Sequence, residues 1–255
     1  MTHAPLTLTD HPLLWRGTQL EHHIATLSSG HEVLDAVLPG RGWPQGAVTE
    51  LLHPAAGFGE LSLLLPVLAQ LSQQQYRISL IDPPWVPYPP ALHGRGLQLD
   101  RLLWVRTKSR AESLWACEQV LRGIPGGAML AWPDKIGFSE LRRMQLAAEN
   151  GQKMVFLFRP AQAVSESSPA ALRLQLDSHD GDLQVRVLKC RGQRARQPIK
   201  LRRLQLLQSC RPQASGVQPL IPPLVSSRGS SKRDNSSSER PLASRATSRT
   251  ERPSL

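Results

Sequence analysis

The chain has 255 residues, of which 40% are hydrophobic, so it is long and apolar enough for one globular domain with appendages. Its formal net charge of +11 favours partners that carry negative charge, although a solvated basic surface without a dedicated partner is the plain alternative. Three cysteines without CxxC spacing argue against a disulfide framework, and neither a signal peptide nor a membrane-length apolar run is apparent. We therefore expect a cytoplasmic protein without a membrane partner, a metal or a cofactor.

The composition predicts three regions along the chain. Residues 1–27 form a predicted helical arm that begins near Pro12, with Asp10 as its cap. Residues 28–205 contain the apolar segments that can build a core. Residues 206–255 are rich in serine and arginine without apolar periodicity, which predicts a disordered basic tail.

Apolar strands alternate with helices through the first part of the core. The predicted strands are 47–52, 77–82, 102–105, 126–132 and 154–158. The predicted helices are 61–74, 109–121 and 139–150, the last capped by Ser139 and ended by Gly151. Pro66 should kink the first helix or mark a late start, and the proline-rich segment 83–90 should be irregular. Near-continuous apolar strands between helices indicate a parallel sheet covered on both faces.

Two later segments alternate with a period of two, which is typical of a hairpin. They are 172–176 and 183–188, and 199–201 is a candidate last strand. The predicted fold class is therefore α/β, with a mostly parallel sheet flanked by helices and antiparallel strands added at one edge.

A strand, a glycine loop and a helix follow one another at 47–74, which is the arrangement of a phosphate-binding loop. A working loop reads GxxxxGK[ST], in which the lysine neutralises phosphate and the hydroxyl holds Mg²⁺. Here His53 replaces the first glycine, the loop is one residue longer, Glu60 replaces the lysine and Leu61 replaces the hydroxyl residue. Gly57 and Gly59 remain, either for binding or because the turn needs small residues.

The charge reversal at Glu60 predicts that the loop does not support hydrolysis. Two like charges about 4 Å apart repel by ~1 kcal/mol in water and by several-fold more at a protein surface. Ser62 could restore a hydroxyl by a register shift, but no residue of the loop restores the lysine. We expect a protein that is not an enzyme.

The stretch LSSGHEVLDAVLPGRGWPQGAVTELL, with RISLID after the glycine loop, resembles the start of the RecA recombinase core. The motifs GHEVLDAVLPGRGWPQGAVTELL and GFGELSLLLPVLAQL more closely resemble the ImuA family, over residues 12–201. This resemblance implies a RecA-like fold and a non-catalytic accessory role in SOS-induced translesion DNA synthesis. The implied partners are an ImuB-like Y-family polymerase homologue and an error-prone polymerase III alpha subunit, together with RecA and DNA.

Two further positions depart from RecA-type enzymes. Where such an enzyme places a glutamate that activates water, this chain has Pro83, Pro84 and Trp85. Where a strand should end in an aspartate that supports magnesium, it has Trp132, and Asp134 lies beyond a proline turn as a candidate cap or turn residue.

The segments ELSLLLPVLAQLSQQ and MVFLFRP also resemble SulA, which implies a cell-division inhibitor that binds FtsZ as the alternative function. The N-terminal extension and the basic segment after the core favour the ImuA family.

Two sets of residues are candidates for partner contact. Trp85 and Tyr88 are either partner anchors or part of a lid packed on the core. A basic segment is either a solvated loop or a contact for DNA or an acidic partner. Its candidate contact residues are Lys189, Arg191, Arg194, Arg196 and Lys200.

Overall fold

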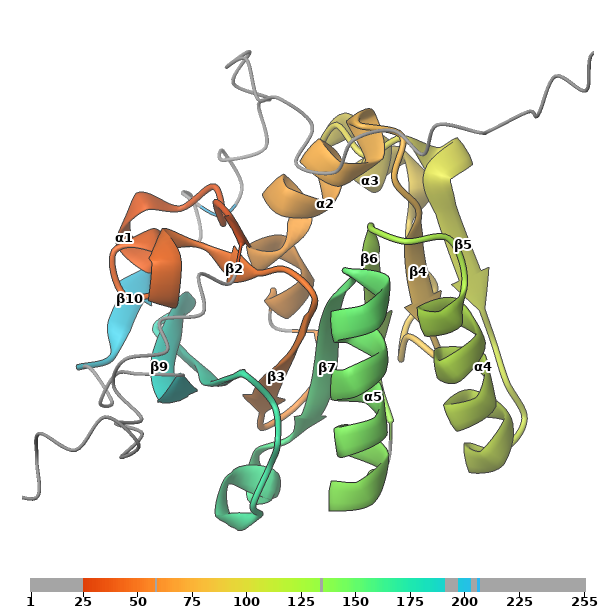
Figure 1. Cartoon of the computed structure of the whole chain (residues 1–255). Coiled ribbons are helices and arrows are strands. Elements are labelled where there is room, and N and C mark those ends of the chain that lie inside the picture. Colours follow the sequence, from red (N-terminus) through yellow and green to blue (C-terminus); the bar gives the residue numbers. More distant parts are fainter. Residues whose placement is uncertain (1–24, 58, 134, 191–196, 203–205, 207–255) are drawn as a thin grey trace, which may run out of the picture. The chain divides into compact units, whose positions relative to one another are not determined.

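The computed structural model describes residues 25–57, 59–133, 135–190, 197–202 and 206. Within them, eight strands form one sheet in the order β10-β9-β8-β3-β7-β6-β4-β5 (Figure 1). This order confirms the predicted fold class, because the central strands are parallel and the antiparallel ones gather at one edge.

All five predicted core strands are present. They are β3 (Ala47–His53), β4 (Ile78–Ile81), β5 (Leu102–Val105), β6 (Ala128–Ala131) and β7 (Met154–Pro160). Every residue of β3, β4 and β6 is buried, as expected for parallel strands covered on both faces. β5 differs because it forms the edge of the sheet, and its central residues Leu103 and Trp104 are exposed.

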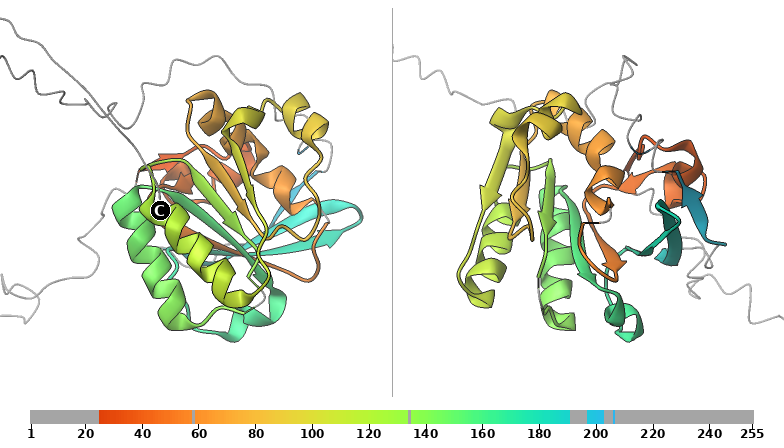
Figure 2. Two further views of the ribbon diagram at one scale, coloured as in Figure 1. Left: turned by 90° about the vertical axis from the view of Figure 1, so that its right-hand side faces the viewer. Right: turned by 180° about the vertical axis from the view of Figure 1, so that it is seen from behind.

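Helices cover both faces of the sheet (Figure 2). On one face, α2 (Leu65–Gln73) packs with α1 (Glu32–Asp35) and the small sheet of β1 (Thr26–Leu27) and β2 (Trp43–Pro44). On the other face, α4 (Arg110–Arg122) and α5 (Phe138–Gly151) lie side by side. The short elements are η2 (Pro39–Arg41), η3 (Glu60–Leu63), α3 (Pro89–Gly94), η4 (Leu99–Arg101) and η5 (Ala161–Ser165).

Prolines mark helix starts at two places. α2 begins only at Leu65, with Pro66 in its first turn, which confirms the late start that the sequence predicted. The prediction that residues 83–90 are irregular is wrong for Pro89 and Pro90, which open α3. A first turn tolerates proline because its N–H would have no helical partner there.

The predicted cap of α5 is displaced by two residues and its predicted end by one. The cap is Gly137 and not Ser139, because the Glu140 carboxylate accepts a hydrogen bond from the Gly137 amide at 2.8 Å. Gly151 is the last helical residue, and Gln152 takes the left-handed conformation that ends the helix, with φ at 49°.

The predicted hairpin consists of β8 (Leu172–His179) and β9 (Asp182–Cys190), and β10 (Ile199–Leu201) pairs with β9 as expected. Asp180 and Gly181 connect the first two strands with φ values of 53° and 77°, the sign that a two-residue hairpin turn requires. β8 runs parallel to β3, so it joins the hairpin to the parallel part of the sheet.

Most of the predicted arm and tail lies outside the described residues. Of the arm, Thr26 and Leu27 form β1. Of the predicted tail, only Leu206 is described, and it is buried in the core beside α2. None of the helices in the described part of the chain combines the length and the apolar character needed to cross a bilayer.

A buried ion cluster joins the three strands at the junction between parallel and added strands. Glu50 of β3 is fully buried and pairs with Arg159 of β7 at 2.6 Å and with Arg173 of β8 at 2.5 Å. Arg159 also pairs with Glu166 at 2.6 Å, and Arg173 donates to the Ala163 carbonyl oxygen at 2.6 Å. Such charges are stable in a core only together, because each offsets the desolvation of the others.

Glu50→Ala is expected to reduce the free energy of unfolding by about 3–5 kcal/mol, because it leaves two buried guanidinium groups without their shared carboxylate. Urea unfolding measures this loss. Glu32→Ala, which removes an exposed carboxylate from α1, is the matched control and should change stability by less than about 1 kcal/mol. Equal losses in the two variants would contradict the role given to the cluster.

Candidate functional site

The degenerate phosphate loop follows β3 at the carboxyl edge of the parallel strands. Gly57 and Gly59 have φ values of 95° and 108°, a region that glycine adopts without the strain imposed on other residues. The turn itself therefore requires both glycines, which supports the interpretation that they remain because the turn needs small residues.

The carboxylate of Glu60 binds the loop's own amides. Its Oε1 accepts a hydrogen bond from the Gly57 N–H at 2.8 Å, and its Oε2 accepts one from the Gly59 N–H at 3.0 Å. The residue is only 5% exposed, so these two charge-assisted hydrogen bonds offset the cost of removing the carboxylate from water. Glu60 is also the first residue of η3, where a negative charge interacts favourably with free helix amides.

This geometry gives the loop a chemistry opposite to that of a phosphate loop. The backbone amides that would cradle a phosphate donate instead to a carboxylate that the chain itself supplies. A phosphate would have to displace Glu60 and then remain close to its negative charge. The sequence predicted the repulsion, but not that Glu60 occupies the anion position itself.

The side chains of Leu61 and His53 also pack against the interior. Leu61 is partly buried and packs against the hydrophobic core cluster that includes the α2 residues. His53 is 8% exposed, and its ring meets the edge of Phe158 at 6.1 Å between centroids.

An aromatic pair lies where the neighbouring strands end. The indole of Trp132, directly after β6, stacks on Phe158 of β7 with 4.5 Å between centroids and 4° between planes. Together with His53, these rings make the carboxyl ends of β3, β6 and β7 aromatic. The position predicted to lack a magnesium-supporting carboxylate is thus filled by a packed ring.

Asp82, at the end of β4, is the nearest carboxylate in sequence to the position expected for a catalytic glutamate. It has a φ of 49° and accepts hydrogen bonds from the backbone N–H of Thr107 at 2.6 Å and from its hydroxyl at 2.7 Å. These bonds join the ends of β4 and β5, so Asp82 has a structural role.

The structure places the two candidate partner anchors at the surface. Trp85 and Tyr88 are 67% and 68% exposed. Trp85 lies beside the degenerate loop, since a Cβ added at Gly57 would meet its indole nitrogen at 3.3 Å. Their exposure does not fit a lid packed into the core, and their contact with a partner stays a prediction.

Two of the five candidate basic contacts are described. Lys189 donates to the Ser168 carbonyl oxygen at 2.6 Å, and Lys200 pairs with Asp182 at 3.4 Å. Both side chains project into solvent from the exposed side of the added strands. Arg191, Arg194 and Arg196 lie outside the described residues, so the nucleic-acid contact stays a prediction.

The described side chains also bear on metal and thiol chemistry. Across the resolved ranges, no group of three or more histidine, cysteine, aspartate or glutamate side chains is arranged to hold a metal ion. Burial raises the pKa of the Cys117 thiol to about 12, which keeps it protonated and unreactive at neutral pH.

The chain is similar in sequence to the recombinase RecA. The protein RecA of Bacillus mycoides (strain KBAB4) is 29% identical over 106 residues, which are 42% of this chain and 31% of that protein. RecA of Bacillus licheniformis is 29% identical over 106 residues, 42% of this chain and 30% of the relative. RecA of Bacillus cereus (strain B4264) is 27% identical over 106 residues, with shares of 42% and 31%.

The similarity spans less than a third of each of these relatives. It supports a distant RecA-like relationship, and the mostly parallel sheet flanked by helices agrees with a RecA-like α/β fold. No family model matches the chain.

The role of Glu60 as a ligand of its own loop was missed from the sequence, although a signal was present. A glutamate three residues after a helix cap can return its carboxylate to the cap's amide, which is the spacing of a capping box. Gly57 and Glu60 have that spacing, although the residue that caps η3 is Gly59 and Glu60 is the first residue of η3.

Glu60→Gln is expected to lower the free energy of unfolding by about 1–2 kcal/mol, because a neutral amide replaces a carboxylate that accepts two backbone hydrogen bonds. Urea unfolding measures the loss, and amide hydrogen exchange should show faster exchange at Gly57 and Gly59. Glu112→Gln is the control, since its exposed carboxylate accepts from a single amide, that of Lys108. A loss no larger than the control's would show that the loop does not depend on Glu60.

Proposed function

We propose that this chain is a non-catalytic RecA-like accessory protein of SOS-induced translesion DNA synthesis. In this role it joins an ImuB-like Y-family polymerase homologue to an error-prone polymerase III alpha subunit, with RecA and DNA as further contacts. The proposal assigns the chain a scaffold's role in which the sheet and helices present surfaces to partners.

The observation that carries the non-catalytic part is the carboxylate of Glu60 on the loop amides at 2.8 and 3.0 Å. A nucleotide would need those amides, a cation and a metal-binding hydroxyl. The chain places a carboxylate, a core-packed leucine and a stacked indole at the corresponding positions.

Two observations support the DNA-damage part. The similarity to RecA connects the chain to a protein of DNA recombination. The finer assignment rests on the resemblance of residues 30–52 and 57–71 to motifs of the ImuA family. The net charge of +11 suits work close to nucleic acid.

We expect no Mg-ATP turnover above background from the wild-type chain or from Glu60→Lys. The single charge reversal restores a cation, but Leu61 and Trp132 still occupy the positions of the hydroxyl and the carboxylate. A phosphate-release assay beside an active RecA checks this. Clear turnover by the wild type would refute the non-catalytic assignment.

The adaptor role predicts a direct complex with an ImuB-like protein. The two purified proteins should co-elute in size-exclusion chromatography at low salt, and the unrelated protein lysozyme, which is also basic, should not bind the ImuB-like protein. Absence of a complex would refute the partner assignment.

Expression of the chain in undamaged cells is a second test, because filamentation would favour FtsZ binding, as in SulA, over the adaptor role.

A further inference from the structure

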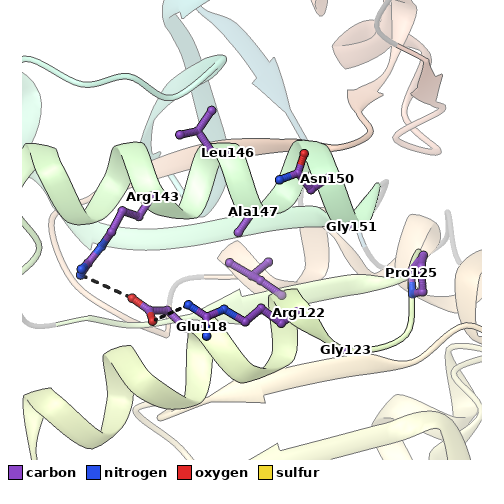
Figure 3. Close-up of a pocket in the computed structure, with 10 residues that line it drawn as sticks. Glu118, Arg122, Gly123, Pro125, Arg143, Leu146, Ala147, Asn150 and Gly151 are labelled. Carbon is purple, nitrogen blue, oxygen red and sulfur yellow. Dashed lines mark ion pairs between the residues drawn. The ribbon is translucent and has the colours of Figure 1, made fainter.

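A groove of about 470 Å³ lies between α4 and α5 (Figure 3). Leu121 of α4 and Ala147 of α5 give it an apolar base. Leu146, on its wall, is 50% exposed. Ile124, between the lining residues Gly123 and Pro125, is 69% exposed. The groove therefore offers apolar surface that the described residues leave in solvent.

Two arginines from different helices converge on one carboxylate at the groove. Arg122 of α4 and Arg143 of α5 approach the carboxylate of Glu118 at 3.6 and 3.4 Å (Figure 3). These distances are long for charge-assisted hydrogen bonds, which are 2.7–2.9 Å in typical structures. The arginine side chains are 70% and 64% exposed, so their ion pairs with Glu118 are loose and solvated.

The charges of the groove do not balance. Two guanidinium groups face one carboxylate, which leaves a net charge of +1 from these three side chains. A guanidinium group has five N–H donors in a planar fork that matches a carboxylate. A second carboxylate placed between Arg122 and Arg143 would balance the charge.

We propose that this groove binds an acidic, apolar segment of a partner protein. A leucine-sized side chain would lie on Leu121, Leu146 and Ala147, while a neighbouring aspartate or glutamate pairs with the two arginines. A nucleic-acid backbone fits less well, because it has no apolar side chain to place on Leu121, Leu146 and Ala147.

The position of the groove makes it independent of the degenerate loop. It extends to the C-terminal ends of α4 and α5, whose chains lead into the first residues of β6 and β7. The degenerate loop instead follows the last residue of the parallel strand β3. The two sites therefore lie at opposite ends of the parallel strands. A segment would bind the groove whether or not the chain works in lesion bypass.

The test uses the full chain and the synthetic peptide Gly-Ser-Leu-Glu-Asp-Leu-Ser-Gly, followed by amide NMR during titration. We expect chemical-shift changes concentrated on the groove residues of α4 and α5. A peptide with lysines in place of its two acids should cause none of them. Leu146→Ser should weaken binding of the acidic peptide without any change in charge.

Charge reversal separates the groove from the general basicity of the chain. Arg122→Glu with Arg143→Glu should weaken peptide binding at least about tenfold, since two attractions become repulsions. Arg142→Glu with Arg186→Glu changes the net charge equally at two exposed arginines outside the groove, and it should leave affinity within about twofold. Thermal unfolding verifies that both double variants are folded.

Three results would overturn the proposal. One is the absence of shifts at the groove when the acidic peptide is added. Another is equal weakening by the two double variants, which would show attraction to bulk charge alone. The third is an oligothymidylate that shifts the groove residues when the peptide does not, which would make the groove a nucleic-acid surface.

Discussion

Two hydrogen bonds from loop amides to the Glu60 carboxylate determine what the carboxyl edge of this sheet can do. In a phosphate loop the amides remain available, and the bound nucleotide satisfies them. Here the satisfying anion is part of the chain, so the loop is complete without a ligand. The buried carboxylate and the two left-handed glycines hold one another in place. A nucleotide would therefore compete with a group whose effective concentration is that of a tethered neighbour.

The residues around the loop, at the carboxyl ends of the parallel strands, are also consistent with a loop that needs no ligand. Trp132 stacks on Phe158, and the Asp82 carboxylate accepts hydrogen bonds from Thr107, so both side chains have structural roles. The buried cluster around Glu50 fixes β3 between β7 and β8, which positions the strand from which the loop departs. Packing and ion pairs thus hold the framework around the loop without a nucleotide.

The positions of the strands and the burial of the central strands were predictable from the sequence, because apolar runs between helices have few alternative arrangements. The site was predictable only in part. The segments Gly57–Leu61 and Gly137–Leu141 read GFGEL and GFSEL, and in each the glutamate binds the amide of the glycine three residues earlier. The same local spacing was thus present twice, once at the cap of α5 and once within the loop before η3. The pairing of Glu50 with Arg159 and Arg173 was not predictable, because it joins residues more than 100 positions apart through strand register.

The loop at the carboxyl ends of the strands and the groove between α4 and α5 differ in the surface that they leave exposed to a partner. At the carboxyl ends of the strands, Glu60 accepts the hydrogen bonds of the loop amides and Trp132 stacks on Phe158, while Trp85, Val86 and Tyr88 are exposed to solvent. Between α4 and α5, by contrast, Arg122 and Arg143 share one carboxylate at long range beside exposed leucine surface. Affinity for a new partner comes from groups whose charge or apolar area is still uncovered. Because the loop amides are occupied by the chain's own carboxylate, the helical face has more uncovered charge and apolar area to offer a partner than the loop.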